Sequence, residues 1–426
     1  MCMTRRKFIL TSCGVSLCLL APLEGSIQPI KAMGIVEVFA DGAHLSAVVV
    51  AYDKPLSGVI ATAFKVEGRT IQKVYLRQSP TKGEATVKGK FVILELSLDD
   101  AQIDLKEEVA LKQKKGAPKQ VDKPRFKAGE PSGHNLMFKT PKAHVDILNS
   151  PSLEISSIYY PIVEDFIAQD FYDETNHQNL HYNLFIPKDI GKKHLPLVLF
   201  IHDAGSISTF VKATLLQGLG AVIFAHPKEQ IKRPCFVLAP QYDTVIVDDD
   251  SKASPLLDTT IHLIQSLSKK YPIDLKRLYT TGQSMGCMAS IAMLIKYPNF
   301  FAGAFLVAGQ WKASLCAPLV KDKLFIMVSA DDPGAYPGEN AIVAFLEQKG
   351  AKIAKGVWNG AWQAKQFKEA YEKLSDQKAT IRYVVFSKGS VLSPTDTNKG
   401  SAHRNTWKIA YSIEPIREWL FEQVLA

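Results

Sequence analysis

The chain is poor in the features that mark disulfide-rich and fibrous proteins. Only six of its 426 residues are cysteine, and glycine and proline occur at the ordinary frequencies of a globular protein. Three cysteines lie within the first 18 residues, and the remaining three are Cys235, Cys287 and Cys316. Because an odd number forms no complete disulfide framework, we expect these three to be small buried apolar side chains. A Cys287–Cys316 bridge is the alternative.

Acidic residues are outnumbered by basic ones, 42 to 51, which gives a net charge of +9. Such an excess favours nucleic acid or an anionic surface as a partner. However, residues 101–142 alone hold ten Lys and Arg against five Asp and Glu. The sequence has no basic helical pattern and no RNA-binding motif with interspersed aromatic residues. We therefore predict a solvated basic loop and no nucleic-acid partner.

The first 32 residues have the pattern of an export signal. Thr4–Leu10 (TRRKFIL) closely resembles the bacterial twin-arginine motif, and a weakly apolar run follows to about Leu23. That run is shorter than the ~20 apolar residues that a membrane span needs, and no later run is long enough. We predict a leader at residues 1–32, cleaved between Gly25 and Ala32, and export to the periplasm or the extracellular space. We expect no stable membrane span.

Short strands dominate the next part of the chain, residues 33–160. Apolar and polar positions alternate there, and turn signals separate the strands at intervals typical of an all-β sandwich. The expected strands are residues 36–39, 44–52, 59–66, 70–77, 90–98 and 143–148. Residues 101–142, rich in Lys, Pro and Gly, are predicted to be either an insertion between late strands or a linker.

Continuous apolar runs replace the alternating pattern in residues 161–426. Such runs are typical of strands buried on both faces, and helical patterns lie between them, as in a parallel α/β sheet. The expected strands are residues 180–187, 195–201, 236–239, 278–281, 304–308, 324–329 and 381–386. The expected helices are residues 256–270, 285–296, 340–349 and 367–374.

A GxSxG motif, Gly282-Gln283-Ser284-Met285-Gly286, lies between an expected strand and an expected helix. This is the setting of a nucleophile elbow, in which a sharp turn lifts the serine hydroxyl above the sheet. Flanking glycines allow the close approach of strand and helix that a Cβ would block. We therefore predict that Ser284 is a catalytic nucleophile.

A serine nucleophile needs a base and an acid that orients the base, in the chain order Ser, Asp or Glu, His. His403 is the only histidine after the motif, so it is the predicted base, in a flexible loop after the last strand. The acid is expected at the end of the strand over residues 324–329. Asp332, which precedes a proline, is preferred there over Asp331.

The oxyanion hole requires two backbone N–H donors. Met285, which follows the nucleophile, is predicted to supply one. Ala204, in the loop after the strand at residues 195–201, is predicted to supply the other. Asp203 precedes Ala204 in this loop, and we expect its carboxylate either to oppose an anionic transition state or to point to solvent. His202 is predicted to be structural.

The residues of the substrate pocket are harder to predict. Trp311, after the strand at residues 304–308, and Gln283, inside the motif, are the predicted pocket residues. Trp407 has helical spacing to a later tryptophan and is predicted to lie in the core. Asp248–Asp250 is expected to be a solvated acidic loop rather than a metal site. No metal and no organic cofactor is expected.

The motif segments also resemble a known family. Residues 163–426, through segments 197–205, 278–289, 328–340 and 403–420, resemble bacterial α/β-hydrolase esterases that are often labelled predicted peptidases, relatives of polyhydroxybutyrate depolymerases and feruloyl esterases. Residues 41–75 resemble the immunoglobulin-like domain that precedes the hydrolase in one esterase subgroup. The resemblance implies an α/β-hydrolase fold after an immunoglobulin-like sandwich, and an immunoglobulin-like domain that contributes to oligomer contacts and shapes the active site.

Together these patterns predict an exported serine carboxylic-ester hydrolase that works through an acyl-enzyme. The resemblance implies short-chain or aromatic acyl esters, either small or linked to a polymer, as substrates. Two alternatives remain: an exported serine peptidase with the same three side chains, and a non-catalytic binding protein that keeps the hydrolase fold.

Overall fold

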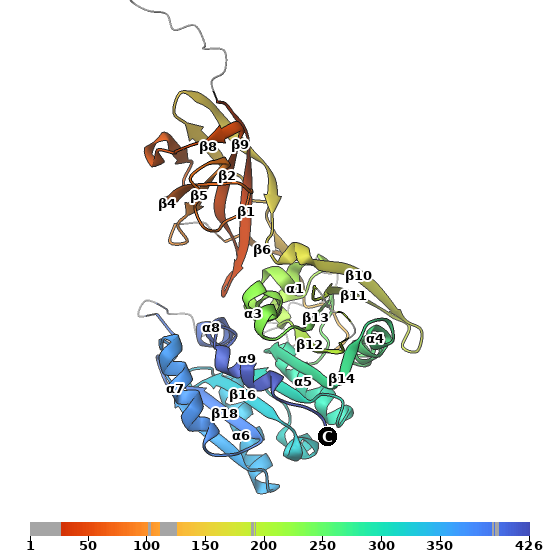
Figure 1. The fold of residues 1–426 in the computed structure, drawn as a ribbon. Coiled ribbons are helices and arrows are strands. Elements are labelled where there is room, and N and C mark those ends of the chain that lie inside the picture. The colour runs from red at the N-terminus through yellow and green to blue at the C-terminus, as the bar shows by residue number, and fades with distance from the viewer. Residues whose placement is uncertain are drawn as a thin grey trace, which may run out of the picture.

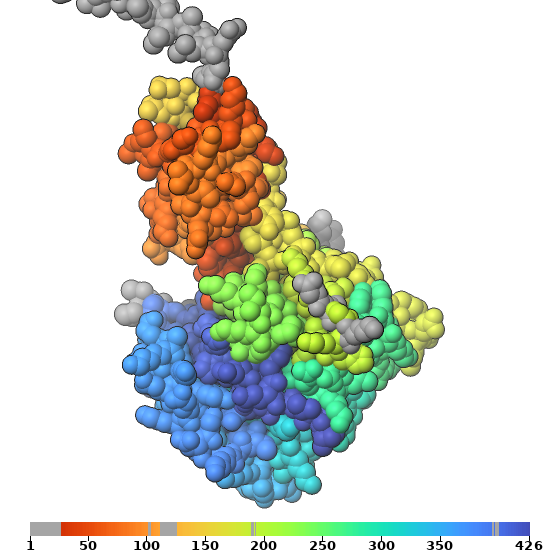
Figure 2. Space-filling view, viewed as in Figure 1, coloured from red at the N-terminus to blue at the C-terminus, as the bar shows by residue number. Residues whose placement is uncertain are grey.

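The protein has two domains, each built around one large β-sheet (Figure 1). The structure is a computed structural model, and it describes residues 27–100, 104–110, 126–188, 191, 193–393, 396 and 400–426. Figure 2 shows the N-terminal domain as a separate lobe standing on the larger C-terminal lobe. Most of the predicted leader, residues 1–26, and part of the predicted basic loop, residues 101–103 and 111–125, lie outside the described residues.

The N-terminal domain is a seven-stranded sheet with the order β3-β8-β9-β1-β2-β5-β4. Its strands are β1 (Pro29–Phe39), β2 (Gly42–Leu56), β3 (Phe64–Val66), β4 (Ile71–Arg77), β5 (Gly89–Leu96), β8 (His144–Ile147) and β9 (Ser150–Tyr159). The first half of β9 pairs with β8 and its second half pairs with β1, so this one strand joins the two parts of the β domain.

The start of the first domain differs from the prediction. Ala32 is fully buried in β1, where it pairs with Val50 and Ile155. Cleavage of a leader that ended at residue 32 would therefore remove Pro29–Ala32, the first residues of a paired strand. The fold places the start of the domain at Pro29 instead. The strand predicted over residues 59–66 is also shorter, because Ala61–Ala63 forms a 3-10 turn before β3.

The described residues of the insertion at residues 101–142 do not form a free linker. It contains the antiparallel strands β6 (Lys106–Ala110) and β7 (His134–Phe138). The Leu136 amide donates to the Ile207 carbonyl of the second domain at 3.0 Å. The insertion therefore joins the two domains through backbone hydrogen bonds, which the loop-like composition did not reveal.

The C-terminal domain is a nine-stranded sheet with the order β10-β11-β13-β12-β14-β15-β16-β18-β17, parallel from β13 onward. Its strands are β10 (Phe166–Asp173), β11 (Gln178–Phe185), β12 (Leu195–Ile201), β13 (Phe236–Gln241), β14 (Ile273–Gln283), β15 (Gly303–Val307), β16 (Leu324–Ser329), β17 (Ile353–Trp358) and β18 (Ile381–Phe386). The sequence missed β10 and β17. Both are edge strands with mixed exposure, so neither has the continuous apolar run of a central strand.

Helices flank this sheet (Figure 1). They are α1 (Ala213–Leu216), α2 (Leu219–Ala225), α3 (Pro227–Lys232), α4 (Leu256–Lys270), α5 (Met285–Lys296), α6 (Ala335–Gln348), α7 (Ala364–Ser375), α8 (Ser401–Ala410) and α9 (Glu414–Phe421). The predicted bounds of α4 and α5 agree with the structure. The α/β-hydrolase fold after a β domain, predicted from the sequence, is therefore the observed fold class.

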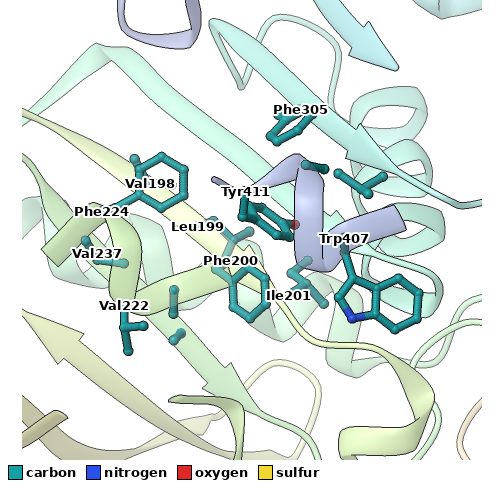
Figure 3. Packing of buried hydrophobic residues seen from close by; sticks show 14 of the residues in the cluster. Val198, Leu199, Phe200, Ile201, Val222, Phe224, Val237, Phe305, Trp407 and Tyr411 are labelled. Atoms are coloured by element: carbon teal, nitrogen blue, oxygen red, sulfur yellow. The ribbon is translucent and has the colours of Figure 1, made fainter. Parts of the chain in front are cut away.

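A buried aromatic cluster holds α8 against the sheet (Figure 3). Tyr411, the residue after α8, packs edge-on against Phe200 of β12 and Phe305 of β15, with ring centroids 5.8 and 5.5 Å away. Its hydroxyl lies 3.2 Å from the Thr281 hydroxyl of β14. Neighbouring Thr280 faces Ser290 of α5 at 2.8 Å, so α5 and Tyr411 lie on opposite faces of the sheet.

A buried carboxylate joins the β10–β11 hairpin to α4. Asp173 accepts hydrogen bonds from Asn176, His262 and Thr259 at 2.7, 2.8 and 2.9 Å. Burial alone raises the pKa of Asp173, but these hydrogen bonds lower it to about 2. Its charged form therefore stabilises the fold above its ordinary pKa of 3.8, and this contribution is lost as the pH falls towards about 2.

We expect Asp173→Asn to lower the free energy of unfolding by about 1–2 kcal/mol at neutral pH, and by much less near pH 2. Asp170→Asn, on the same strand but exposed, is the matched control and should change stability little. Denaturant unfolding of both variants across the acid range measures the difference. An equal loss of unfolding free energy at acid and neutral pH in Asp173→Asn would contradict a stabilising role for the charged carboxylate.

Candidate active site

Ser284 lies in a strained turn between β14 and α5. Its φ of 53° is in the left-handed region, where a non-glycine residue is held only by its surroundings. A Cβ on Gly286 would lie 1.9 Å from the Ile201 carbonyl oxygen, and one on Gly282 would lie 2.5 Å from the Gly286 backbone. The two glycines are therefore required for α5 to approach β12 this closely. The Ser284 amide donates to the Val307 carbonyl at 3.0 Å, which fixes the turn.

His403 lies within hydrogen-bond distance of Ser284. Its Nε2 is 2.9 Å from Ser284 Oγ, although 119 residues separate the two in the chain. The expected flexible loop is wrong here, because His403 sits in the first turn of α8. Trp407, one turn later, packs edge-on against the imidazole with ring centroids 4.9 Å apart. The helical register therefore brings this tryptophan, predicted to be only a core residue, into contact with His403.

Asp332 is the carboxylate that contacts the imidazole. Its Oδ2 is 2.5 Å from His403 Nδ1, and its Oδ1 accepts from the Gly334 and Ala335 amides at 3.0 and 2.9 Å. Burial raises the pKa of Asp332, but the hydrogen bonds from His403 and the two amides lower it below its ordinary value. Asp331 instead accepts a hydrogen bond from the Gly389 amide. The structure thus brings Asp332, and not Asp331, to His403.

The loop after β12 carries Ala204, and Ala204 lines the same cavity as Ser284 and Met285. Because Met285 opens α5, its amide has no acceptor inside the helix. Both predicted oxyanion donors are therefore at the nucleophile.

The Asp203 side chain is held by three hydrogen bonds. Its carboxylate accepts from the Gly205 amide, the Ser206 hydroxyl and Gln283 Nε2, at 2.8, 3.1 and 3.0 Å. The carboxylate is therefore held by the loop and by Gln283 of β14, and the residue is partly exposed. Because these three donors hold the Asp203 side chain in place, the residue fixes the turn at Ala204.

His202 is fully buried next to this loop and makes backbone contacts. Its Nε2 accepts from the Tyr242 amide at 3.0 Å, so the proton is on Nδ1, which donates to the Asp203 carbonyl at 2.7 Å. Burial lowers the pKa of His202, which keeps the ring neutral. His202 therefore positions the loop, as expected from the sequence.

A cavity of about 530 Å³ opens at Ser284. Apolar side chains, including Val245, Val247 and Met288, form much of its wall. The two predicted pocket residues are not among its lining residues. Gln283 is buried and bonds to Asp203 and Gln217, and Trp311 lies beside the wall without reaching the cavity. The prediction of Gln283 and Trp311 as pocket residues is therefore wrong, and their neighbours Ser284 and Gln310 line the cavity instead.

The N-terminal insertion supplies one wall of the cavity through Phe126. The backbone that follows Phe126 forms hydrogen bonds with the loop after β13. The Gly129 amide donates to the Val245 carbonyl at 2.7 Å, and the Val245 amide donates to the Glu130 carbonyl at 3.0 Å. This contact could not be predicted from the sequence, because the segment has no periodic pattern and its partner lies more than a hundred residues away in the chain.

The acidic loop Asp248–Asp250 is only partly solvated. Asp248 is buried, and its carboxylate accepts from the Ala128, Asp250 and Lys252 amides at 3.2, 3.0 and 3.0 Å. Within the described ranges, no three His, Cys, Asp or Glu side chains gather as a metal site. In the same part of the chain, no helix is long and apolar enough to cross a membrane.

The fold and the site together define an α/β-hydrolase-fold protein in which a serine, a histidine and an aspartate converge. Residues 31–146 match the family model described as the esterase Ig-like N-terminal domain. The predicted resemblance to esterases with an immunoglobulin-like N-terminal domain is therefore confirmed for the first domain. A search among curated proteins finds no significant match.

Solved structures extend the likeness to the whole chain. A thermostable esterase is 24% identical, with a TM-score of 0.74, over 92% of this chain and 99% of that chain. A fluorophosphonate-binding serine hydrolase of Staphylococcus aureus is 13% identical, with a TM-score of 0.39, over 60% of this chain and 98% of that chain. A feruloyl esterase module from Clostridium thermocellum is 12% identical, with a TM-score of 0.39, over 58% and 87%. The first of these shows that the two-domain fold is shared.

Because Asp332 and not Asp331 contacts His403, we expect substitutions of these two aspartates to differ in their effect on the reactivity of Ser284. Asp332→Asn removes the acceptor that holds the imidazole tautomer, so fluorophosphonate labelling of Ser284 should slow by about 10³–10⁴-fold. Asp331→Asn is the matched control and should label at a rate within about twofold of the parent protein. Labelling that is quenched at successive times and analysed by peptide mapping measures both rates. Equal slowing in the two variants would contradict the geometry.

Proposed function

We propose that the protein is a serine carboxylic-ester hydrolase that acts through an acyl-enzyme. The observation that carries the proposal is the imidazole of His403, which bridges Ser284 Oγ at 2.9 Å and Asp332 Oδ2 at 2.5 Å. An unassisted hydroxyl is a weak nucleophile, and a base at hydrogen-bond distance activates it. The fold shared with an esterase supports this reading.

The reaction follows from this arrangement. Ser284 Oγ attacks the ester carbonyl carbon while its proton passes to His403 Nε2, and the Met285 and Ala204 amides bind the developing oxyanion. His403 then returns the proton to the leaving alcohol, which leaves the acyl group on Ser284. A water molecule, deprotonated by His403, releases the acid and restores the serine. Asp332 stays ionised and stabilises the imidazolium.

We further propose that the protein is exported by its twin-arginine leader and acts in the periplasm or outside the cell. The proposed substrates are small-molecule or polymer-linked esters with a short-chain or aromatic acyl group, which the cavity of about 530 Å³ can accommodate. A homo-oligomer through the immunoglobulin-like domain is part of the same proposal. N-terminal mapping of the secreted protein tests export, and a start before Pro29 is expected, because β1 begins there.

We expect Ser284→Ala to lower kcat for p-nitrophenyl acetate by about 10⁴–10⁶-fold while leaving the free energy of unfolding little changed. Ser290→Ala, which changes a buried serine in the adjacent helix α5, is the control for mutating a serine in this region. Initial rates and denaturant unfolding measure the two effects. Turnover by Ser284→Ala at the parent rate would overturn the assignment of the nucleophile.

The alternative of an exported serine peptidase differs in the bond that is cleaved. A matched pair of substrates, an ester and an anilide with the same acyl group, separates the two. For an esterase, we expect the ratio of kcat/KM for the ester to kcat/KM for the anilide to be much larger than the ratio of the uncatalysed hydrolysis rates of the two substrates. Comparable acceleration of both bonds over their uncatalysed rates would favour the peptidase.

A further inference from the structure

The cavity at Ser284 has a polar wall that the proposed reaction does not use. Gln310 Nε2 donates to Asp249 Oδ1 at 2.7 Å, and both residues line the cavity. Asp249 follows β13 and Gln310 follows β15, and in the sheet these strands lie on opposite sides of β14, which leads to Ser284. The Asp249–Gln310 pair therefore links the two loops that flank the nucleophile.

Other contacts fix both loops in place. The Lys312 amide donates to the Ser251 hydroxyl at 2.9 Å, a second link between the same two loops. The Gly309 amide donates to the buried carboxyl group of Glu339 at 2.9 Å, which anchors the backbone next to Gln310. The polar pair is therefore ordered before any substrate binds, as a recognition element must be.

The pair leaves two acceptor atoms that the described residues do not use. The bond between Gln310 and Asp249 uses an N–H of the amide, and within the described part of the chain no other hydrogen bond reaches Asp249 Oδ2 or Gln310 Oε1. Among the described residues that line the cavity, none is lysine or arginine. Asp249 is an exposed carboxylate at the edge of a largely apolar cavity, and no described lining residue supplies it with a basic partner.

The chemistry of this wall decides what binds well beside it. A methyl group placed there strips water from the Asp249 carboxylate without replacing its hydrogen bonds, and a second carboxylate adds repulsion. An ammonium or hydroxyl group supplies the missing donor, and an ammonium group forms a charge-assisted hydrogen bond. The wall therefore favours donors and disfavours anions.

We propose that Asp249 and Gln310 are specificity-determining residues that select esters whose acyl chain carries a hydrogen-bond donor, an ammonium group above all, at its far end. The inference rests on the proposed ester hydrolysis and names its preferred substrate class. Ser284 and the oxyanion donors hold the carbonyl group, and the apolar walls at Val245, Val247 and Met288 cover the chain between the two polar ends.

The test compares p-nitrophenyl esters of straight acyl chains of two lengths, about six and eight carbons. Each chain ends in a methyl, hydroxyl, ammonium or carboxylate group. For the parent protein, kcat/KM is expected to be highest for the ammonium ester and lowest for the carboxylate ester. In Asp249→Asn the ammonium-to-methyl ratio should fall by about tenfold or more, and the carboxylate ester should gain relative to the methyl ester.

The matched control is Asp243→Asn, which removes one exposed carboxylate from the same loop but does not line the cavity. It should leave every ratio within about twofold of the parent value, because Asp243, unlike Asp249, does not line the cavity in which the acyl chain binds. Ratios taken within one enzyme cancel any general loss of activity. Equal ratios in the parent protein and Asp249→Asn, or the same fall in Asp243→Asn, would overturn the inference.

Failure of this inference is distinct from failure of the proposed function. If p-nitrophenyl acetate is hydrolysed in a Ser284-dependent manner and the ratios do not respond to Asp249, only the specificity proposal fails. If no ester is hydrolysed by the parent protein, the proposed function fails, and the specificity proposal fails with it.

Discussion

The site depends on one imidazole that bridges two loops far apart in the chain. His403 contacts Ser284 across 119 residues and Asp332 across 71 residues. Hydrogen bonds of this kind form only if each partner is held by its own element, because a distance of 2.9 Å leaves little room for movement. The glycines of the elbow fix Ser284, and two amides at the start of α6 fix Asp332. On the His403 side, the buried ring of Tyr411 holds α8 on the sheet.

The N-terminal domain contributes to the same site in a way that its separate sheet does not suggest. Its insertion bonds to the loops after β12 and β13, and it places Phe126 in the cavity wall. The loop after β12 also carries Ala204, so the insertion contacts the segment that holds a proposed oxyanion donor. Cutting or shortening the insertion would therefore alter the cavity as well as the connection between the domains.

The central strands, the elbow and the residues Ser284, His403 and Asp332 could be predicted from the sequence, because apolar runs, flanking glycines and a single late histidine are local signals. The edge strands β10 and β17 were missed, because partly exposed strands lack such runs. The cavity wall could not be predicted either. Phe126, Asp249 and Gln310 meet only through tertiary packing, and the sequence favoured Trp311, whose neighbour Gln310 lines the cavity instead.

Covalent trapping of Ser284 measures whether His403 activates its hydroxyl group. The protein is treated with a fluorophosphonate, and intact-mass measurement with peptide mapping then follows the adduct in the parent chain and in His403→Ala. We expect a single adduct, on Ser284, that forms orders of magnitude more slowly in His403→Ala than in the parent chain. An adduct on another residue, or labelling of Ser284 at an unchanged rate in His403→Ala, would contradict it.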